Sequence, residues 1–386
     1  MLVFCSFLGA CARPEGAAPM LPSTTARHEL TRDSSNYATL FAFSGWNGAD
    51  AMSQLTYFNG RLYGTTRYGG LYSWGSVFSI SLTGVEKLIY SFRPIYDGVE
   101  PMAGLTALDG MLYGTTYTDA YYERGTVFSI SPTGKERVLH VFGQKDGQNP
   151  MAALTVLNGL LYGTTIQGGA HNGGSVFSIT KSGTFRVIHS FGYGEGNDGS
   201  SPFGGLTVYN GILYGTTFAG GKCNGTIFSV TPSGKEQVLY DFGCKPGDGA
   251  EPGATMIVRN GTFYGTTEAG GKVFYNAGIV FSFTPPRTER ILYTFYGTNP
   301  PARPKASLVE FNGLLYGTTS IGGENNYGTI FSLTPSGSLN VLYSFGSPPD
   351  GRTPEAGLTA VKNTLYGTTT TGGGFRNSGT IFTLSP

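Results

Sequence analysis

Residues 157–169 read LNGLLYGTTIQGG, and residues 209–221 repeat this stretch as YNGILYGTTFAGG. The tyrosine of the Tyr-Gly-Thr-Thr motif recurs at positions 63, 113, 162, 214, 264, 316 and 366, so successive copies lie 49 to 52 residues apart. Repeats of about 40 to 50 residues are typical of propeller blades such as WD40 and kelch units, whereas the coils of a β-helix are much shorter. The spacing therefore predicts a β-propeller.

One repeat unit, read from Ala153, contains four segments with the alternating pattern of a strand. ALTVL leads into Asn158-Gly159, a strong signal for a tight hairpin, and LLYGTT, GSVFSIT and FRVIHSF follow it. No stretch carries an apolar stripe of helical period. We predict an all-β fold, a seven-bladed β-propeller with four-stranded blades at about 53–92, 103–142, 152–191, 204–242, 254–295, 306–345 and 356–384, the last completed by 38–43.

The two ends of the repeat region complement each other. The seventh unit stops at GTIFTLSP, after its third strand, whereas ATLFAFSG at residues 38–45 matches the fourth-strand sequence NVLYSFGS of the sixth unit. Four-stranded blades need neighbours on both faces, and a closed ring supplies them. We predict that residues 38–43 form the outer strand of the last blade and close the ring.

The composition agrees with many short strands and tight turns. The chain has 61 glycines in 386 residues and only 13% charged residues, against about 25% in a typical domain. Its net charge is +1, so it lacks the basic footprint of a nucleic-acid-binding protein. A closed ring leaves few open strand edges, so we expect a monomer.

Residues 1–37 differ from the repeats and read as an export segment followed by a flexible linker. MLVFCSFLGACAR is too short for a membrane-spanning helix of about 20 residues, but it suits the apolar part of a secretory signal. The stretch Leu8 to Cys11 resembles a lipoprotein cleavage box, which would make Cys11 a lipid anchor and the chain's one link to a membrane. The alternatives are an ordinary cleaved signal or a start codon assigned at the wrong place. We expect an exported protein, whether periplasmic, at the cell surface or secreted.

The repeat sequence GLTVLNGLLYGTT..GG...GTVFSI.PSG...LYSFG..DG..P, spread over residues 38–386, resembles the bacterial tandem repeat called GloVer. This resemblance covers about nine tenths of the chain and implies a propeller-like, exported and variously anchored protein. It brings no catalytic residues with it.

Residues present in every unit are expected to build the ring. A phenylalanine in each third strand should fill the core between blades, and the glycine of Tyr-Gly-Thr-Thr should let sheets approach closely. The linking loops carry Asp-Gly at 97–98, 146–147, 198–199, 248–249 and 350–351, which suits turns but lacks the clustered carboxylates of a calcium site. We therefore expect no metal and no cofactor. His140 and His189 occupy the tyrosine slot of LYSF, so we interpret them as structural, and the loop residue His171 as solvated.

Two cysteines of the repeat region belong to one hairpin. Cys223 and Cys244 flank the third and fourth strands of the fourth blade, and an even-length turn centred between Ser233 and Gly234 places them opposite each other. A three-residue turn with a bulge would shift this register by one residue. Export favours oxidation, so we predict a disulfide worth about 3 kcal/mol in the loop-entropy model.

The long, variable loops between second and third strands share one face with the links between blades, and binding residues concentrate on such loops. Both tryptophans lie on loops that border the first blade. Exposed aromatic rings beside polar groups suit sugars. The candidate ligand-binding residues are Trp46, Arg67, Tyr68, Tyr72, Trp74, Asp119, Tyr121, Tyr122, Glu123, Arg124, Phe375 and Arg376.

We predict a non-catalytic binding module whose ligand is a glycan or a surface protein. The alternative is an extracellular carbohydrate-active enzyme on the same face, with Asp119, Tyr121, Glu123 and Arg124 as a lyase or glycosidase set. A scaffold without a ligand is a third reading.

Overall fold

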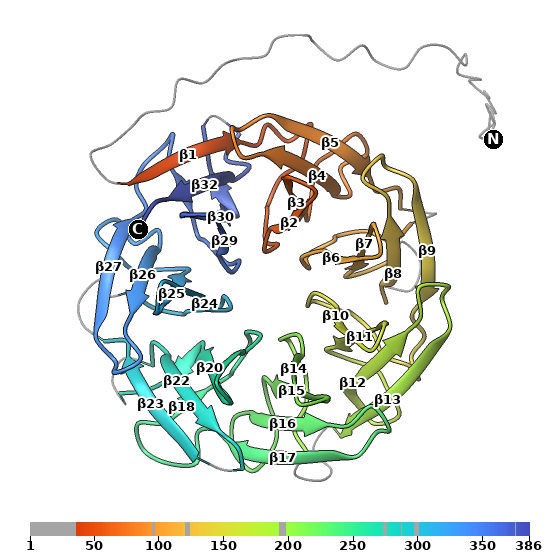
Figure 1. Ribbon diagram of the computed structural model, residues 1–386, viewed down its shortest axis with the longest axis vertical. Coiled ribbons are helices and arrows are strands. Elements are labelled where there is room, and N and C mark those ends of the chain that lie inside the picture. Colours follow the sequence, from red (N-terminus) through yellow and green to blue (C-terminus); the bar gives the residue numbers. More distant parts are fainter. Residues whose placement is uncertain are drawn as a thin grey trace, which may run out of the picture. The chain divides into compact units, whose positions relative to one another are not determined.

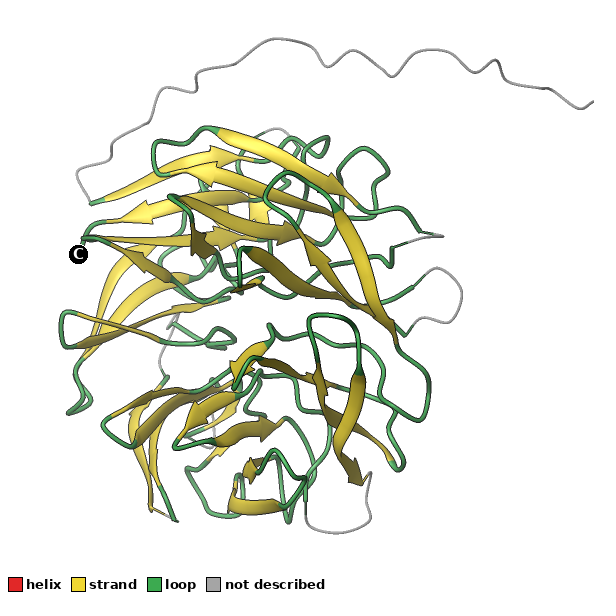
Figure 2. Ribbon diagram, turned by 45° about the vertical axis from the view of Figure 1, so that its right-hand side comes forward, coloured by secondary structure: helices red, strands yellow, loops and turns green. Residues whose placement is uncertain are grey.

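The computed structural model describes residues 36–94, 97–119, 124–192, 198–272, 276–286, 288–296, 301–374 and 376–386. In this part of the chain, seven antiparallel four-stranded sheets form the blades of a β-propeller (Figure 1). Figure 2 shows strands throughout the ring, and the described residues contain no helix, hence none long and apolar enough to cross a membrane. The predicted fold class is confirmed.

In blades 1 to 6 the strands run in chain order from the inside of the blade outward. Blade 1 is β2 (Thr56–Phe58), β3 (Arg61–Thr66), β4 (Ser76–Ser81) and β5 (Glu86–Ser91). Blade 2 is β6 (Thr106–Leu108), β7 (Met111–Thr116), β8 (Thr126–Ile130) and β9 (Glu136–Val141). Blade 3 is β10 (Thr155–Leu157), β11 (Leu160–Thr165), β12 (Asn172–Ile179) and β13 (Phe185–Gly192). Blade 4 is β14 (Thr207–Tyr209), β15 (Ile212–Thr217), β16 (Thr226–Val230) and β17 (Glu236–Asp241).

The remaining blades follow the same plan. Blade 5 is β19 (Ile257–Arg259), β20 (Thr262–Thr267), β22 (Ile279–Thr284) and β23 (Thr288–Thr294). Blade 6 is β24 (Val309–Phe311), β25 (Leu314–Thr319), β26 (Thr329–Leu333) and β27 (Leu339–Ser344). Blade 7 is β29 (Thr359–Val361), β30 (Thr364–Thr369), β32 (Thr380–Leu384) and β1 (Tyr37–Ala42). Two short ladders lie in the loops, β18 (Gly249–Ala250) with β21 (Ala269–Gly270) and β28 (Gly351–Arg352) with β31 (Thr371–Gly372).

The ring closes as the sequence predicts. β1 pairs with β32, so that Tyr37 lies opposite Leu384 and Ala42 opposite Thr380. Figure 1 shows these first and last strands side by side in one blade. On the inner side, the Thr359 hydroxyl donates a hydrogen bond of 2.5 Å to the backbone carbonyl of Leu55 in blade 1. The first and last blades are therefore joined at both the outer and the inner edge.

Phenylalanines form the core between blades. Phe177 in β12 is fully buried and lies edge-on against Phe142, which follows the outer strand of the preceding blade, with ring centroids 5.2 Å apart. The same contact recurs at all seven interfaces, including Phe43 with Phe78 at the closure, 5.1 Å apart. Edge-to-face pairs at this separation are favourable beyond the area that they bury. The predicted role of these phenylalanines is confirmed.

The glycine of Tyr-Gly-Thr-Thr has a different role from the expected one. A Cβ atom at Gly163 would lie 2.5 Å from Cζ of Phe177, which is its cross-strand partner in the same blade. The glycine thus makes room for a phenylalanine of its own sheet rather than for a neighbouring sheet. The two threonines of the motif make different hydrogen bonds, one to the next blade and one within the same blade. Thr164 donates to the Gly204 carbonyl of the next blade at 3.0 Å, and the Thr165 hydroxyl lies 2.9 Å from that of Ser175 within its own blade.

A disulfide joins Cys223 and Cys244, whose Cα atoms are 5.5 Å apart. The prediction is confirmed, although the register arises differently. The turn is the three-residue form, because the Thr231 N–H donates to the carbonyl of Lys235 at 3.0 Å. A bulge at Leu239 then shifts the pairing by one residue. The two deviations cancel, and the cysteines meet.

Candidate functional site

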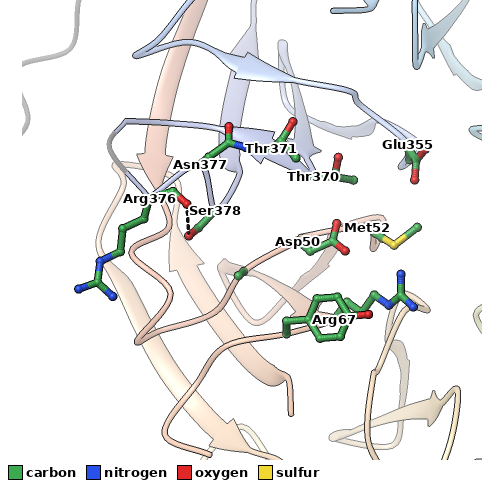
Figure 3. Close-up of a pocket in the computed structure, with 11 residues that line it drawn as sticks. Asp50, Met52, Arg67, Glu355, Thr370, Thr371, Arg376, Asn377 and Ser378 are labelled. Atoms are coloured by element: carbon green, nitrogen blue, oxygen red, sulfur yellow. Dashed lines mark hydrogen bonds between the residues drawn. The ribbon is translucent and has the colours of Figure 1, made fainter. Parts of the chain in front are cut away.

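The candidate site is a pocket of about 450 Å³ where blade 7 meets blade 1 (Figure 3). Four segments form it: the link from β1 to β2, the β3–β4 loop, the β30–β32 loop and the link from blade 6 to blade 7, which carries Glu355. Backbone hydrogen bonds tie these loops together, from Ala49 to Tyr68 within blade 1 and from Asp50 to Ser378 across the seam. The lining residues are Ala49, Asp50, Met52, Arg67, Tyr68, Glu355, Thr370, Thr371, Arg376, Asn377 and Ser378.

Asp50 is fixed by its backbone and presents its carboxylate to the pocket. Its N–H donates to the Ser378 carbonyl at 3.1 Å, and its own carbonyl accepts from the N–H of Arg67 at 3.0 Å. Burial raises the pKa of Asp50 to about 6; Arg67 opposes this rise, while repulsion from Glu355 and Glu100 adds to it. A carboxyl group with this pKa can exchange a proton near neutral pH.

The cations near Asp50 are held by other carboxylates. The Arg67 guanidinium donates twice to one oxygen of Glu100 in the link to blade 2, at 3.0 and 3.1 Å, and lies 4.7 Å from the centre of the Tyr68 ring. Across the pocket, Lys305 of the link to blade 6 donates to Oε1 of Glu355 at 2.7 Å. These cross-blade contacts fix the charged walls of the pocket.

Exposed aromatic side chains gather beside the pocket. Trp46 is 64% exposed, Tyr72 52%, Trp74 42% and Tyr68 37%. The guanidinium carbon of Arg376 lies 5.7 Å from the centre of the Trp46 ring. In Figure 3, Arg376 lies at the end of the pocket opposite Met52 and Glu355, with its guanidinium directed away from them.

The structure brings together part of the predicted set. Arg67, Tyr68 and Arg376 line the pocket, and Trp46 joins it through Arg376. Trp74 is linked to the blade 2 side, because its carbonyl accepts a hydrogen bond of 3.2 Å from the Glu100 N–H. Tyr72, Asp119 and Arg124 do not line the pocket. Tyr121, Tyr122, Glu123 and Phe375 lie outside the described residues, as does Cys11.

Sequence reasoning missed the polar residues of the links. Asp50 precedes the first inner strand at a repeat slot whose residues share a positive φ of 53° to 60°: Asp50, Glu100, Asn149, Ser201, Glu251, Arg303 and Thr353. In each blade, the carbonyl of this residue accepts a hydrogen bond from the residue after Tyr-Gly-Thr-Thr. The backbone conformation at this position is the same in every unit, whereas the side chain differs from unit to unit. An alignment of the seven units on the next position, which is proline in six units and Ala51 in the first, would have identified it.

The two histidines of the tyrosine slot have structural partners. His140 Nε2 lies 2.9 Å from a carboxylate oxygen of Asp146, and His189 Nε2 lies 3.2 Å from one of Asp198. In blade 6, Tyr343 makes the same contact with the loop aspartate Asp350 at 2.8 Å. These histidines therefore replace a tyrosine that hydrogen-bonds to the aspartate of the link between blades. His171 is exposed.

No three metal-ligating side chains of His, Cys, Asp or Glu gather within the described residues. The loop aspartates instead accept hydrogen bonds from their own links, as Asp248 does from the Gly243 N–H at 2.9 Å.

The model of the Gloeobacter/Verrucomicrobia repeat matches residues 59–275 and 271–386. The chain belongs to the Gloeobacter/Verrucomicrobia repeat family. Its blades are the structural form of that repeat, and the pocket lies where the first and the last copy meet. Among curated proteins, none matches the sequence.

Solved structures share the propeller fold of this family member at low sequence identity. A streptogramin B lyase structure is 16% identical with a TM-score of 0.61, covering 90% of this chain and 96% of the lyase chain. PorZ, a surface component of the type-IX secretion system of Porphyromonas gingivalis, is 13% identical with a TM-score of 0.55, covering 88% of this chain and 46% of PorZ. At such identities these likenesses show the fold alone.

Proposed function

We propose that this repeat propeller is an exported, non-catalytic binding module that takes a glycan into the pocket between blades 7 and 1. The observation that carries the proposal is the composition of the pocket. Carboxylate, guanidinium, hydroxyl and amide groups from Asp50, Arg67, Thr371 and Asn377 converge on one open hollow. Hydroxyl-rich ligands need such donors and acceptors, and fixed side chains recognise them without a large ordering cost.

The aromatic residues at the rim support the same ligand class. One face of Trp46 is approached by Arg376, and the high exposure of this side chain leaves its other face to solvent. A sugar ring stacks its C–H face on such a surface while its hydroxyls reach the polar wall. Arg67, held by Glu100 over Tyr68, presents a rigid donor rather than a mobile one.

Export is part of the proposal. The apolar run in residues 1–13 suits a signal, and the Cys223–Cys244 disulfide is the kind of bond that persists in oxidising compartments. Fractionation of cells that express the full chain tests this part. Export predicts the protein outside the cytoplasm, with Cys223 and Cys244 oxidised, and a reduced cytoplasmic protein contradicts it.

A glycan array probed with the purified protein tests the ligand class. The Trp46→Ala variant removes an exposed ring at the rim, and Tyr57→Ala, which removes a ring 44% exposed on the inner strand β2, is the matched control. We expect glycan binding that is lost in Trp46→Ala and kept in Tyr57→Ala. An array without any bound glycan rejects the proposal and leaves a surface protein as the ligand.

A carbohydrate-active enzyme is the second candidate, and the pKa of Asp50 favours it. A carboxyl with a pKa of about 6 in a pocket suits a general acid or base. Mass spectrometry of each bound glycan separates the two functions. Intact glycan supports binding alone, and cleaved glycan whose formation stops in Asp50→Asn supports the enzyme.

A further inference from the structure

Asp50 and Glu355 both line the pocket, and the charge of Glu355 repels that of Asp50. In Figure 3 they gather with Met52 and the Arg67 guanidinium at one end, while Arg376 lies at the other. Among the described residues, none donates a hydrogen bond to the Asp50 carboxylate, and Glu355 accepts one only on Oε1, from Lys305. The pocket therefore offers carboxylate oxygens that the protein itself leaves open.

The arginines of the pocket are engaged elsewhere. Arg67 is drawn toward blade 2 by its two hydrogen bonds to Glu100, and the Arg376 guanidinium lies over Trp46 at the far end. An acidic ligand group at the Asp50 end would meet two carboxylates, and the nearby cations Arg67 and Lys305 are already paired with Glu100 and Glu355. A cationic group would instead meet two acceptors that repel each other.

We propose that the pocket recognises a protonated amine of its ligand, seated between Asp50 and Glu355, so that the glycan class is an amino sugar with a free amine. This inference rests on the proposed glycan-binding function and specifies its ligand. At Glu355 the ligand amine would use Oε2, because Oε1 already accepts a hydrogen bond of 2.7 Å from Lys305. An ammonium group donates three hydrogen bonds, and Asp50, Glu355 and the wall threonines offer oxygens to accept them.

The repulsion of the Asp50 carboxylate by neighbouring carboxylates also favours a cationic ligand group. Glu355 and Glu100 both disfavour the charged form of Asp50, whereas Arg67 alone favours it. A ligand cation at this place relieves that repulsion and keeps Asp50 ionised. A charge-assisted hydrogen bond of this kind is stronger than one between neutral groups.

Isothermal titration at neutral pH tests the inference with three tetrasaccharides of one linkage, made of glucosamine, N-acetylglucosamine or glucose. We expect the glucosamine tetramer to bind about tenfold more tightly than the other two. Asp50→Asn keeps the backbone, because Asn149 occupies the same slot with a φ of 57°. In this variant and in Glu355→Gln, the preference for the amine should fall below about threefold.

Asp109→Asn is the matched control. It removes a carboxylate at the tip of the β6–β7 hairpin, where five other blades carry asparagine, and it should leave the preference intact. Equal binding of the three tetramers, or an amine preference that survives in Asp50→Asn, overturns the inference while the glycan-binding function stands. If no glycan binds, here or on the array, both fail.

Discussion

The Tyr37 hydroxyl donates a hydrogen bond of 2.7 Å to the Asp350 carboxylate, joining positions that are 313 residues apart in the chain. The Tyr37 ring also stacks on Tyr343, with centroids 3.7 Å apart. These contacts attach the first strand to the link between blades 6 and 7. The ring, and with it the pocket at the seam, depends on this long-range closure.

A chain that begins at Ser44 tests this dependence. It lacks β1, so the backbone groups of β32 that pair with β1 lose their partners and the Phe43–Phe78 contact disappears. We expect rapid hydrogen exchange in β32, with slow exchange retained in blades 3 and 4. A synthetic peptide of residues 36–43 should restore protection of β32, and a scrambled peptide should not. Unchanged protection in the truncated chain would contradict the proposed closure.

Gly163 tests the packing of the repeated motif. Gly163→Ala forces a Cβ atom to within 2.5 Å of the Phe177 ring, so we expect a loss of about 1–3 kcal/mol in the free energy of unfolding. Denaturant unfolding measures this loss. The double variant Gly163→Ala, Phe177→Leu should lose less than the sum of the single variants, because the smaller side chain makes room. Additive losses would show that the ring is not what the glycine accommodates.

Four glutamates at the start of outer strands predict a pH-dependent stability. Glu86, Glu136, Glu236 and Glu289 each bury Oε1 without a hydrogen-bond partner, and burial raises the pKa of each to about 7. Because the folded-state pKa lies above the unfolded value of 4.5, their contribution is fully present below about pH 4.5. It is lost as the pH rises through about 7.

Thermal unfolding from pH 5 to pH 8.5 checks this prediction. The wild type should lose about 1 kcal/mol for each glutamate over this range, since partial exposure screens the charge. The variant with all four glutamates replaced by glutamine should show a flatter pH profile and a higher Tm at pH 8. Identical profiles for the two proteins would refute the assignment.

Asp50→Asn separates stability from binding at one position. Burial and like charges disfavour the ionised Asp50 in the folded protein, so its contribution to stability is lost as the pH rises from about 4 through about 6. Above pH 6 the asparagine variant should therefore be about 1 kcal/mol more stable than the wild type, while it loses the amine preference. Unfolding curves at pH 5 and pH 8 measure the difference. A variant that is less stable at pH 8 would contradict the electrostatic role of Asp50.

The fold could be predicted from the sequence because the same pattern of strands and turns recurs in seven units. Motif spacing, the Asn158-Gly159 turn and the complementary ends of the repeat region each depend on local patterns that a ring can satisfy in one way. Even the disulfide of Cys223 was predictable, although a turn and a bulge compensate each other in its hairpin.

The residues of the pocket could be predicted from the sequence only in part. Trp46, Tyr68 and Arg376 stand out as aromatic or cationic residues on variable loops, whereas Asp50 and Glu355 lie in short links with turn-like sequences. Their proximity arises from ring closure, which brings together side chains some 300 residues apart, as the hydrogen bond between Thr359 and Leu55 does across 304 residues. No local pattern in the sequence carries that information.

A crystal structure with the tightest-binding array glycan tests the central claim most directly. We predict a sugar in the pocket between blades 7 and 1, with its polar groups within hydrogen-bond distance of Asp50 and Glu355 and one ring against Trp46. A glycan bound on the opposite face, or anywhere that leaves this pocket empty, would contradict the claim.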